Sequence, residues 1–174
     1  MDEHVAELIA LLARSRQALL MALEGLPQDT AIYESWELKH LLAHIAGWEE
    51  ACVTSIRAYV QGGGYEIPAY RGIDAYNELS VDTRTALNYA QVYAEWEAVR
   101  RELIEALGAV PPELALGRMM LPWAEDGTLE DLVNTMAYHE LEHAEDVHKL
   151  KPVSDQDAPA APPDSMIALD GEAG

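Results

Sequence analysis

Four long stretches of the chain place apolar residues at intervals of three or four positions, a spacing typical of amphipathic helices. They run from Glu3 to Gly25, from Ser35 or Trp36 to Val60, from Asp82 or Thr83 to Leu107, and from Thr128 to Lys149 or Lys151. No stretch shows the sustained alternation of apolar and polar residues that marks a half-buried strand. The sequence therefore predicts an all-α fold, a four-helix bundle with long loops between its helices.

Residues that break helices separate these stretches. Gly25 and Pro27 follow the first stretch, Gly62 to Gly64 the second, and Gly108, Pro111 and Pro112 the third. Two connections, residues 62–81 and 109–127, are long, and loops of that length are more often functional than neutral. We expect the first of them to contain a short helix from about Asp74 to Leu79.

The last part of the chain differs in composition from the rest. Residues 152–174 are rich in Pro, Ala and Asp, and such a segment cannot bury enough apolar surface to fold alone. We therefore expect one bundle domain over residues 1–151 and a flexible C-terminal tail over residues 152–174.

The net charge, the hydropathy and the single cysteine limit the partners, the location and the thiol chemistry that we expect. The formal net charge is −20, from 11 basic and 31 acidic residues, and it disfavours nucleic acid and anionic membranes as partners. No apolar run is long enough to cross a bilayer, and the acidic start Met1-Asp2-Glu3-His4 does not resemble a secretory signal, so we expect a cytoplasmic protein. Cys52 lies in an apolar helical pattern, where a buried and inert thiol is expected.

Two histidines in the fourth stretch are spaced for metal binding. His139 and His143 are four residues apart, so on a helix they differ by about 40° in direction and about 6 Å in height. Both lie on the apolar stripe that also carries Met136 and Val147, which predicts that they face inward or line a cleft. A pair of this kind alone is weak evidence for a metal, since two surface histidines would give the same spacing.

A third histidine strengthens that interpretation. His44 lies on the inward stripe of the second stretch, between Leu41 and Trp48. If the two stripes pack together, three imidazoles meet and leave open coordination positions, as in catalytic rather than structural metal sites. The nearby Gly47 costs a helix about 1 kcal/mol relative to alanine, which indicates close approach of another backbone or a ligand.

A di-iron carboxylate site is the alternative use of the same histidines. Glu37-x-x-His40 and Glu140-x-x-His143 both fit the Glu-x-x-His pattern of such bundles. The further carboxylates would come from the other two helices: Glu102 or Glu105, and Glu7 or Glu24. We favour the three-histidine site, because an acidic residue such as Glu37 in a first helical turn already has a helix-dipole reason to be there. His40 then lies beside the site.

Two acidic residues are candidates for supporting roles. Asp146, one turn beyond His143, could orient that ring through a hydrogen bond. Glu49 could do the same for His44 or act as a general base. The acids around the histidine pair are expected on a solvated face: Glu140, Glu142 and Glu145.

Residues around these histidines resemble a known family. The segments Trp36-Glu-Leu-Lys-His-Leu-Leu-Ala-His44-Ile-Ala-Gly-Trp48-Glu49 and Tyr138-His139-Glu-Leu-Glu-His143 resemble the DinB-like (DinB/YfiT) superfamily of four-helix-bundle proteins. The resemblance spans roughly residues 3 to 150. The phrase from Ala43 to Glu49, with Pro68-Ala-Tyr-Arg and Tyr76-Asn77-Glu78 downstream, is most similar to the DfsB/ClbS branch.

The resemblance implies a metal-dependent function. In the family, one histidine of the second helix and a His-x3-His pair of the fourth bind zinc, nickel or iron, and these positions correspond to His44, His139 and His143. Members include thiol-dependent S-transferases and isomerases, hydrolases and self-protection proteins, and homodimers are frequent. His40 departs from the family pattern, where an acidic or other polar residue is common.

Our hypothesis from the sequence is a divalent-metal-dependent enzyme. It would activate water or a low-molecular-weight thiol for attack on a small electrophile, held in a pocket whose walls include Trp48, Tyr138 and the two long loops. The other interpretation left open is a non-catalytic protein that binds or sequesters a small hydrophobic compound.

Overall fold

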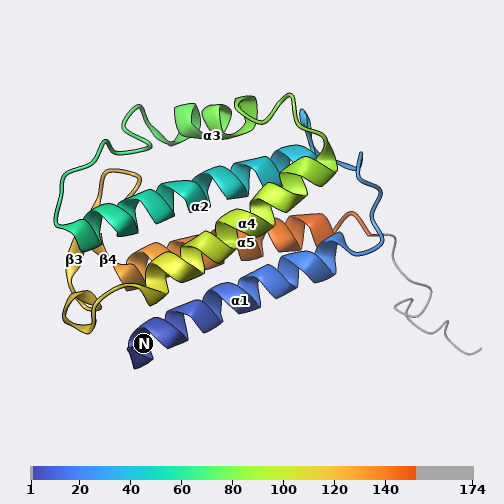
Figure 1. Ribbon diagram of the computed structural model, residues 1–174. Coiled ribbons are helices and arrows are strands. Elements are labelled where there is room, and N and C mark those ends of the chain that lie inside the picture. Colours follow the sequence, from blue (N-terminus) through green and yellow to red (C-terminus); the bar gives the residue numbers. More distant parts are fainter. Residues whose placement is uncertain (1, 152–174) are drawn as a thin grey trace, which may run out of the picture.

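The computed structural model describes residues 2–151, which form a bundle of helices (Figure 1). The four long helices are α1 (Glu3–Leu23), α2 (Leu38–Gln61), α4 (Tyr89–Gly108) and α5 (Leu129–His148), and α3 (Ile73–Asp82) is shorter. The all-α prediction is confirmed, and the expected short helix is α3. The predicted tail, residues 152–174, lies outside the described residues.

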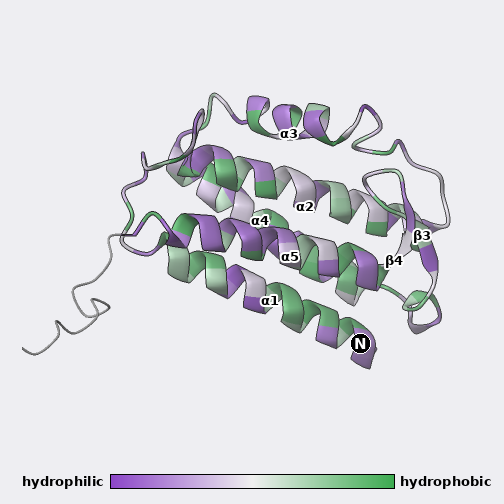
Figure 2. Cartoon of the chain, turned by 180° about the vertical axis from the view of Figure 1, so that it is seen from behind, coloured by the Kyte–Doolittle hydropathy of each residue, from purple (hydrophilic) through white to green (hydrophobic). Residues whose placement is uncertain are grey.

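The direction of the helices sets which of them are neighbours. Figure 1 shows α1 and α5 running one way and α2 and α4 the other, while α3 lies along the outer side of α2. The segment that contains α3 runs back along α2, so α4 starts at the same end of the bundle as α2. Seen from behind, α5 lies between α1 and α2 (Figure 2), which brings the two histidine-bearing helices together.

A short β-hairpin precedes each of the two helices that carry the histidines, α2 and α5. Strands β1 (Ala31–Tyr33) and β2 (Trp36–Glu37) precede α2, and β3 (Arg118–Met120) and β4 (Asp126–Thr128) precede α5. A single 3-10 turn, η1 (Pro112–Leu114), lies in the connection after α4. At the start of α5 the hydroxyl of Thr128 accepts a hydrogen bond from the backbone N–H of Asp131 at 3.1 Å and so caps the helix at the start predicted for the fourth stretch.

The predicted start of the third long helix was wrong. Helix α4 begins at Tyr89, not at Asp82 or Thr83, because Asn88 caps it by accepting a hydrogen bond from the Gln91 N–H at 3.0 Å. On this helix Val92 and Trp96 are fully buried, whereas Ala90 is exposed.

Apolar side chains fill both ends of the bundle interior. One cluster includes Leu12, Ile56, Leu103 and Leu132, and the other includes Leu19, Leu41, Trp96 and Val147. Cys52 is fully buried in the first cluster, and burial raises the pKa of its thiol, which agrees with the expected inert residue. Figure 2 shows hydrophobic and hydrophilic residues interspersed along every long helix, as amphipathic helices require. Within residues 2–151, no helix is long and apolar enough to span a bilayer.

Each of the four long helices contributes one buried charged residue to an ionic cluster in the middle of the bundle. Arg16 donates from Nε to Glu140 Oε1 at 2.7 Å and from Nη2 to Glu49 Oε1 at 2.9 Å. Arg100 donates from Nη2 to Glu140 Oε2 at 2.8 Å and from Nε to Glu49 Oε1 at 2.9 Å. The Ser15 hydroxyl adds a 2.6 Å bond to Glu140. Two positive and two negative groups thus balance one another inside the core.

This cluster corrects one expectation from the sequence. Glu140 was expected on a solvated face, but the residue is fully buried. Its neighbours Glu142 and Glu145 are exposed as expected. Since Glu140 adjoins His139 in the chain, the ionic cluster holds the turn of α5 that carries one histidine of the site.

Candidate metal centre

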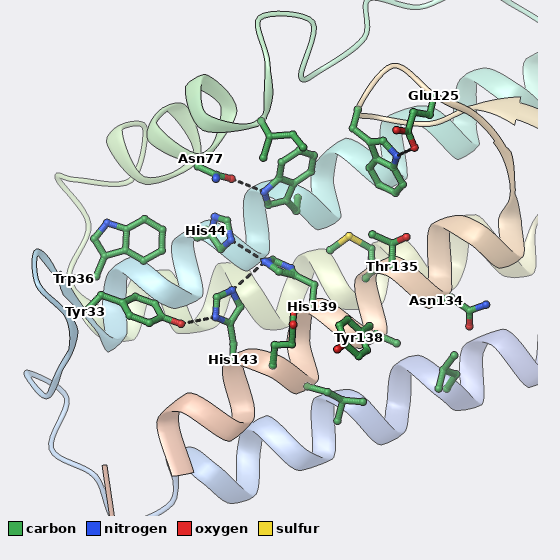
Figure 3. Close-up of a pocket in the computed structure, with 18 of the residues that line it drawn as sticks. Tyr33, Trp36, His44, Asn77, Glu125, Asn134, Thr135, Tyr138, His139 and His143 are labelled. Atoms are coloured by element: carbon green, nitrogen blue, oxygen red, sulfur yellow. Dashed lines mark hydrogen bonds between the residues drawn. The ribbon is translucent and has the colours of Figure 1, made fainter. Parts of the chain in front are cut away.

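The rings of His44, His139 and His143 converge between α2 and α5 (Figure 3). The Nε2 atom of His139 lies 2.9 Å from Nε2 of His44 and 3.0 Å from Nε2 of His143. One ring nitrogen from each residue lies within 4.8 Å of the other two. The structure therefore brings together all three residues that the sequence singled out, although His44 on α2 and His139 on α5 are 95 residues apart in the chain.

The spacing of these nitrogens fits a single cation. Two ligand atoms each about 2.1 Å from one ion lie about 3.0 to 3.4 Å apart at coordination angles of about 90° to 110°. Two of the three Nε2 pairs here are 2.9 and 3.0 Å apart, close to that range. Within residues 2–151, no carboxylate or thiol joins the three imidazoles in this cluster. An all-imidazole set suits borderline ions such as zinc, nickel or iron, and three protein ligands leave positions for a reactant.

The surroundings keep the three imidazoles neutral. Burial, together with the neighbouring imidazoles, lowers the pKa of His44 to about 3 and that of His139 to about 4. Burial also lowers the pKa of His143. Protons therefore compete weakly for these nitrogens at neutral pH, and lone pairs are available for a cation.

Tyr33 and Asp146 fix the ring of His143. The Tyr33 hydroxyl lies 2.9 Å from His143 Nδ1 and donates to Asp146 Oδ2 at 2.9 Å. Because its one hydrogen goes to the carboxylate, the Nδ1–H of His143 donates to the phenol oxygen. Burial and the bond to Asp146 raise the pKa of Tyr33, so the phenol stays protonated. The Nε2 atom of His143 is left with a lone pair directed at the other two imidazoles. His44, His139 and His143 together form a histidine triad.

Asp146 therefore reaches His143 through an intervening tyrosine. The sequence interpretation placed Asp146 beside that ring but did not include Tyr33 of β1, which bridges the two groups. Lys149 also donates to Asp146, at 2.8 Å, and this bond and the one from Tyr33 lower the pKa of the carboxyl group.

The other supporting candidate, Glu49, lies in a different setting. Its Oε1 accepts hydrogen bonds from Arg16 and Arg100, and none of its recorded bonds within residues 2–151 goes to His44. The buried Nδ1 of His44 has no hydrogen-bond partner in the same range. The structure thus assigns Glu49 to the ionic cluster and gives it no contact that would make it a base at the triad.

His40 belongs to the start of α2. Its Nδ1 accepts a hydrogen bond from the backbone N–H of Glu37 at 3.0 Å, which completes a capping box. This contact explains why a histidine one turn before His44 is compatible with a three-histidine site.

The carboxylates required by the di-iron alternative do not gather at the triad. Five of them are exposed at the surface: Glu7, Glu24, Glu37, Glu102 and Glu105. Glu102 instead pairs with Arg57 at 3.0 Å, and Glu140 pairs with two arginines of the ionic cluster. The geometry therefore does not form the di-iron ligand set.

The triad lines a large cavity of about 1330 Å³. Its walls are mainly aromatic and apolar, and Figure 3 shows several of these side chains around the histidines: Tyr33, Trp36 and Tyr138. Trp48 and Tyr138, named from the sequence as pocket walls, both line it. The two long connections also contribute, as expected, through Asn77 and Trp123.

Helix α3 is held against α2 at Gly47. A Cβ atom at Gly47 would lie 2.5 Å from the Cβ of Ser80, closer than real Cβ atoms come. The hydroxyl of Tyr76 donates to the Gly47 carbonyl at 2.8 Å. The close approach expected at this glycine is therefore made by α3, which also brings Asn77 within 2.9 Å of the Trp48 indole nitrogen.

Tyr33 and Trp36 are two aromatic residues of the cavity that the sequence interpretation did not name as site residues. They lie in β1 and β2, strands of three and two residues that are too short for any periodic pattern. A usable signal was their chemistry, two aromatic side chains in a polar connection directly before the helix that carries His44.

Comparisons with known proteins agree with this architecture. A family model described as the DinB superfamily matches residues 11–147. The chain is also similar to the crystal structure of an uncharacterised protein from Escherichia coli UTI89, with a TM-score of 0.69 and 15% sequence identity. That match covers 86% of this chain and 93% of the other, and at this identity it supports the fold alone. No curated protein matches the chain.

Proposed function

The chain belongs to the DinB superfamily, and from that premise we propose that it is a divalent-metal-dependent enzyme. In the proposed reaction, water or a low-molecular-weight thiol attacks a small electrophile, as in a hydrolase or an S-transferase. The observation that carries the proposal is the convergence of three imidazole nitrogens in the wall of a cavity of about 1330 Å³. A ligand set of three, open to a cavity, is typical of catalytic metal sites.

The residues that would hold the ion are His44, His139 and His143. A bound zinc, nickel or iron ion would supply Lewis-acid chemistry, lowering the pKa of water or a thiol and stabilising negative charge on the electrophile. Neutral imidazoles leave the charge of such an ion undiminished. Tyr33 and Asp146 keep the His143 tautomer that offers Nε2, which is a positioning role.

Within residues 2–151, the walls of the cavity offer no activated side-chain nucleophile. Cys52 lies in the apolar core and does not line the cavity. The hydroxyl of Thr135, which does line it, donates to the backbone carbonyl of Asp131 at 2.8 Å. A nucleophile supplied from solution, either water or a thiol, agrees with these contacts.

The size of the cavity is consistent with two reactants. Its volume of about 1330 Å³ exceeds the roughly 300–1,000 Å³ usual for sites that hold one drug-sized molecule. Trp48 and Tyr138 would contact the electrophile, and the aromatic walls would displace water from it.

Two finer features are part of the same proposal. Within the superfamily we place the chain nearest the DfsB/ClbS branch, on the segment from Ala43 to Glu49 and the downstream Tyr76-Asn77-Glu78. We also propose a homodimer, the assembly frequent in the family, which light scattering on the full chain would measure directly.

Turnover by the metal-loaded protein tests the proposed function. We expect activity in a panel that combines thiols with electrophiles or in a panel of hydrolysable compounds, and we expect His139→Ala to lose it while keeping its helical circular dichroism. His148→Ala, an exposed histidine of the same helix, is the matched control and keeps its activity. Full metal loading and tight ligand binding without turnover in either panel would favour a sequestering protein instead.

A further inference from the structure

All the charged side chains that line the cavity beside the histidines carry the same sign. They are Glu34, Glu125 and Glu142, and within residues 2–151 no lysine or arginine lines the cavity. The three carboxylates come from separate parts of the chain: the turn between β1 and β2, the turn between β3 and β4, and α5. Their common sign is therefore a property of the cavity and not of one acidic segment.

The carboxylates lie at the solvent side of the cavity, and the histidines lie deeper. All three glutamates are exposed, whereas His44 is buried. Glu125 is held in place by the indole nitrogen of Trp123, which donates to its Oε2 at 2.9 Å (Figure 3). The three carboxylates, here called the rim, therefore place negative charge on the solvent-exposed part of the cavity lining.

The aromatic walls favour the same sign of ligand as the rim. Trp48 and Trp123 form an edge-to-face pair with ring centroids 6.4 Å apart, and Tyr33 and Trp36 form a second pair at 5.9 Å. All four residues line the cavity. Flat apolar groups pack well on such rings, and the negative faces of the rings attract cations.

We propose that this cavity selects flat, largely apolar molecules that carry a protonated or quaternary amine, in preference to anions of the same shape. The inference rests on the proposed function only in taking the cavity as the substrate site. The apolar body packs against the tryptophans, and the ammonium group faces the carboxylate rim. The same field favours water or an uncharged thiol as co-reactant over a thiol with several carboxylates.

Three pyrene derivatives that differ in one substituent test the proposal: pyrenemethylammonium, pyrenemethanol and pyrenecarboxylate. Three of the four tryptophans line the cavity, so energy transfer from tryptophan to bound pyrene reports binding. For the metal-free full chain at low salt, we expect the ammonium compound to bind at least about tenfold more tightly than the carboxylate, with the alcohol between them. Added salt is expected to narrow the difference.

A matched pair of variants separates the rim from the overall charge of the protein. The rim variant is Glu34→Gln/Glu125→Gln/Glu142→Gln, and the control is Glu7→Gln/Glu105→Gln/Glu113→Gln, three exposed acids outside the cavity. We expect the preference for the ammonium compound to fall several-fold in the rim variant and to persist in the control. Equal affinity for the cation and the carboxylate in the unmodified protein, or equal losses in both variants, would overturn the proposal.

This experiment is independent of the metal. If the protein binds no divalent ion, the proposed function fails, and the preference of the metal-free cavity is still measured. If the protein binds its ion but the three pyrene compounds bind equally, the charge selectivity fails and the proposed metal site stands.

Discussion

The phenol oxygen of Tyr33 lies 2.9 Å from Nδ1 of His143, although the two residues are 110 positions apart in the chain. This contact connects the hairpin that precedes α2 to the last helix of the bundle. It also defines the hydrogen on His143, because the Tyr33 hydroxyl itself donates to Asp146. One tyrosine of the β1–β2 hairpin therefore sets the tautomer of His143 on α5.

Tyr33→Phe is expected to weaken zinc binding by about tenfold or more. The change removes the acceptor for the His143 Nδ1–H, so neither the tautomer nor the ring orientation is fixed, and such supporting contacts typically contribute 10- to 100-fold to metal affinity. Competition with a chromophoric chelator measures the dissociation constant. Tyr70→Phe, at an exposed tyrosine outside the cavity, is the control and should bind zinc normally. An unchanged zinc affinity in Tyr33→Phe would remove the positioning role.

The stability of the metal-free protein should depend on pH through His44. Its pKa is lowered by burial from the ordinary 6.5 to about 3, so below pH 6.5 the unfolded chain takes up a proton that the folded chain does not. The free energy of unfolding therefore falls as pH decreases from about 6.5 towards 3, by about 2 kcal/mol at pH 5 for this residue.

Urea titrations of the metal-free protein at pH 7 and pH 5 measure that effect. His44→Gln should lose about 2 kcal/mol less between the two pH values than the unmodified chain does. His148→Gln, at an exposed histidine, should follow the unmodified chain. The same pH dependence in all three proteins would show that His44 is not buried in the neutral form.

Removing one arginine of the ionic cluster is expected to destabilise the bundle strongly. Arg100→Met leaves Glu49 and Glu140 buried with one cationic partner fewer, and breaking a buried pair in this way typically costs about 3–5 kcal/mol. Glu102→Gln, which breaks the exposed pair with Arg57, should cost less than about 1 kcal/mol. Denaturant unfolding compares the two variants, and similar losses would mean that the cluster is not the desolvated network described.

Gly47→Ala should loosen the packing of α3 on α2. The new methyl group would overlap the Cβ of Ser80, and an overpacked contact of this kind typically costs about 1–3 kcal/mol, more than alanine gains in helix propensity. Hydrogen exchange should be faster in α3 of the Gly47→Ala variant. Adding Ser80→Gly, which removes the overlapping side chain, should partly restore slow exchange in the Gly47→Ala/Ser80→Gly double variant. Additive effects of the two substitutions would contradict direct contact between these positions.

The bundle and the convergence of the histidines could be predicted because both depend on helical periodicity. His44 and the pair His139 and His143 each lie on an apolar stripe, and packing of the stripes brings the rings together. The start of the fourth helix at Thr128 could also be predicted, because the hydrogen bonds of a helix cap are local. The bound ion, by contrast, stays a prediction.

The remaining parts of the site depend on partners that are far away in the sequence. Glu140 lies four residues after Met136 and seven before Val147, on the buried face of α5. Its charge nevertheless suggested exposure, because the partners that neutralise it, Arg16 and Arg100, are 124 and 40 positions away. Tyr33 belongs to a strand too short to show a period. Its role becomes visible only when the β1–β2 hairpin is placed against α5.

The metal content of protein purified without chelator or affinity tag tests the central claim most directly. Elemental analysis after loading with zinc, nickel or iron is expected to find one divalent ion per chain in the unmodified protein and none in the His44→Ala/His139→Ala/His143→Ala variant, with the fold of that variant checked by circular dichroism. A protein that takes up no ion, or a triple variant that binds as much as the unmodified chain, would contradict the account.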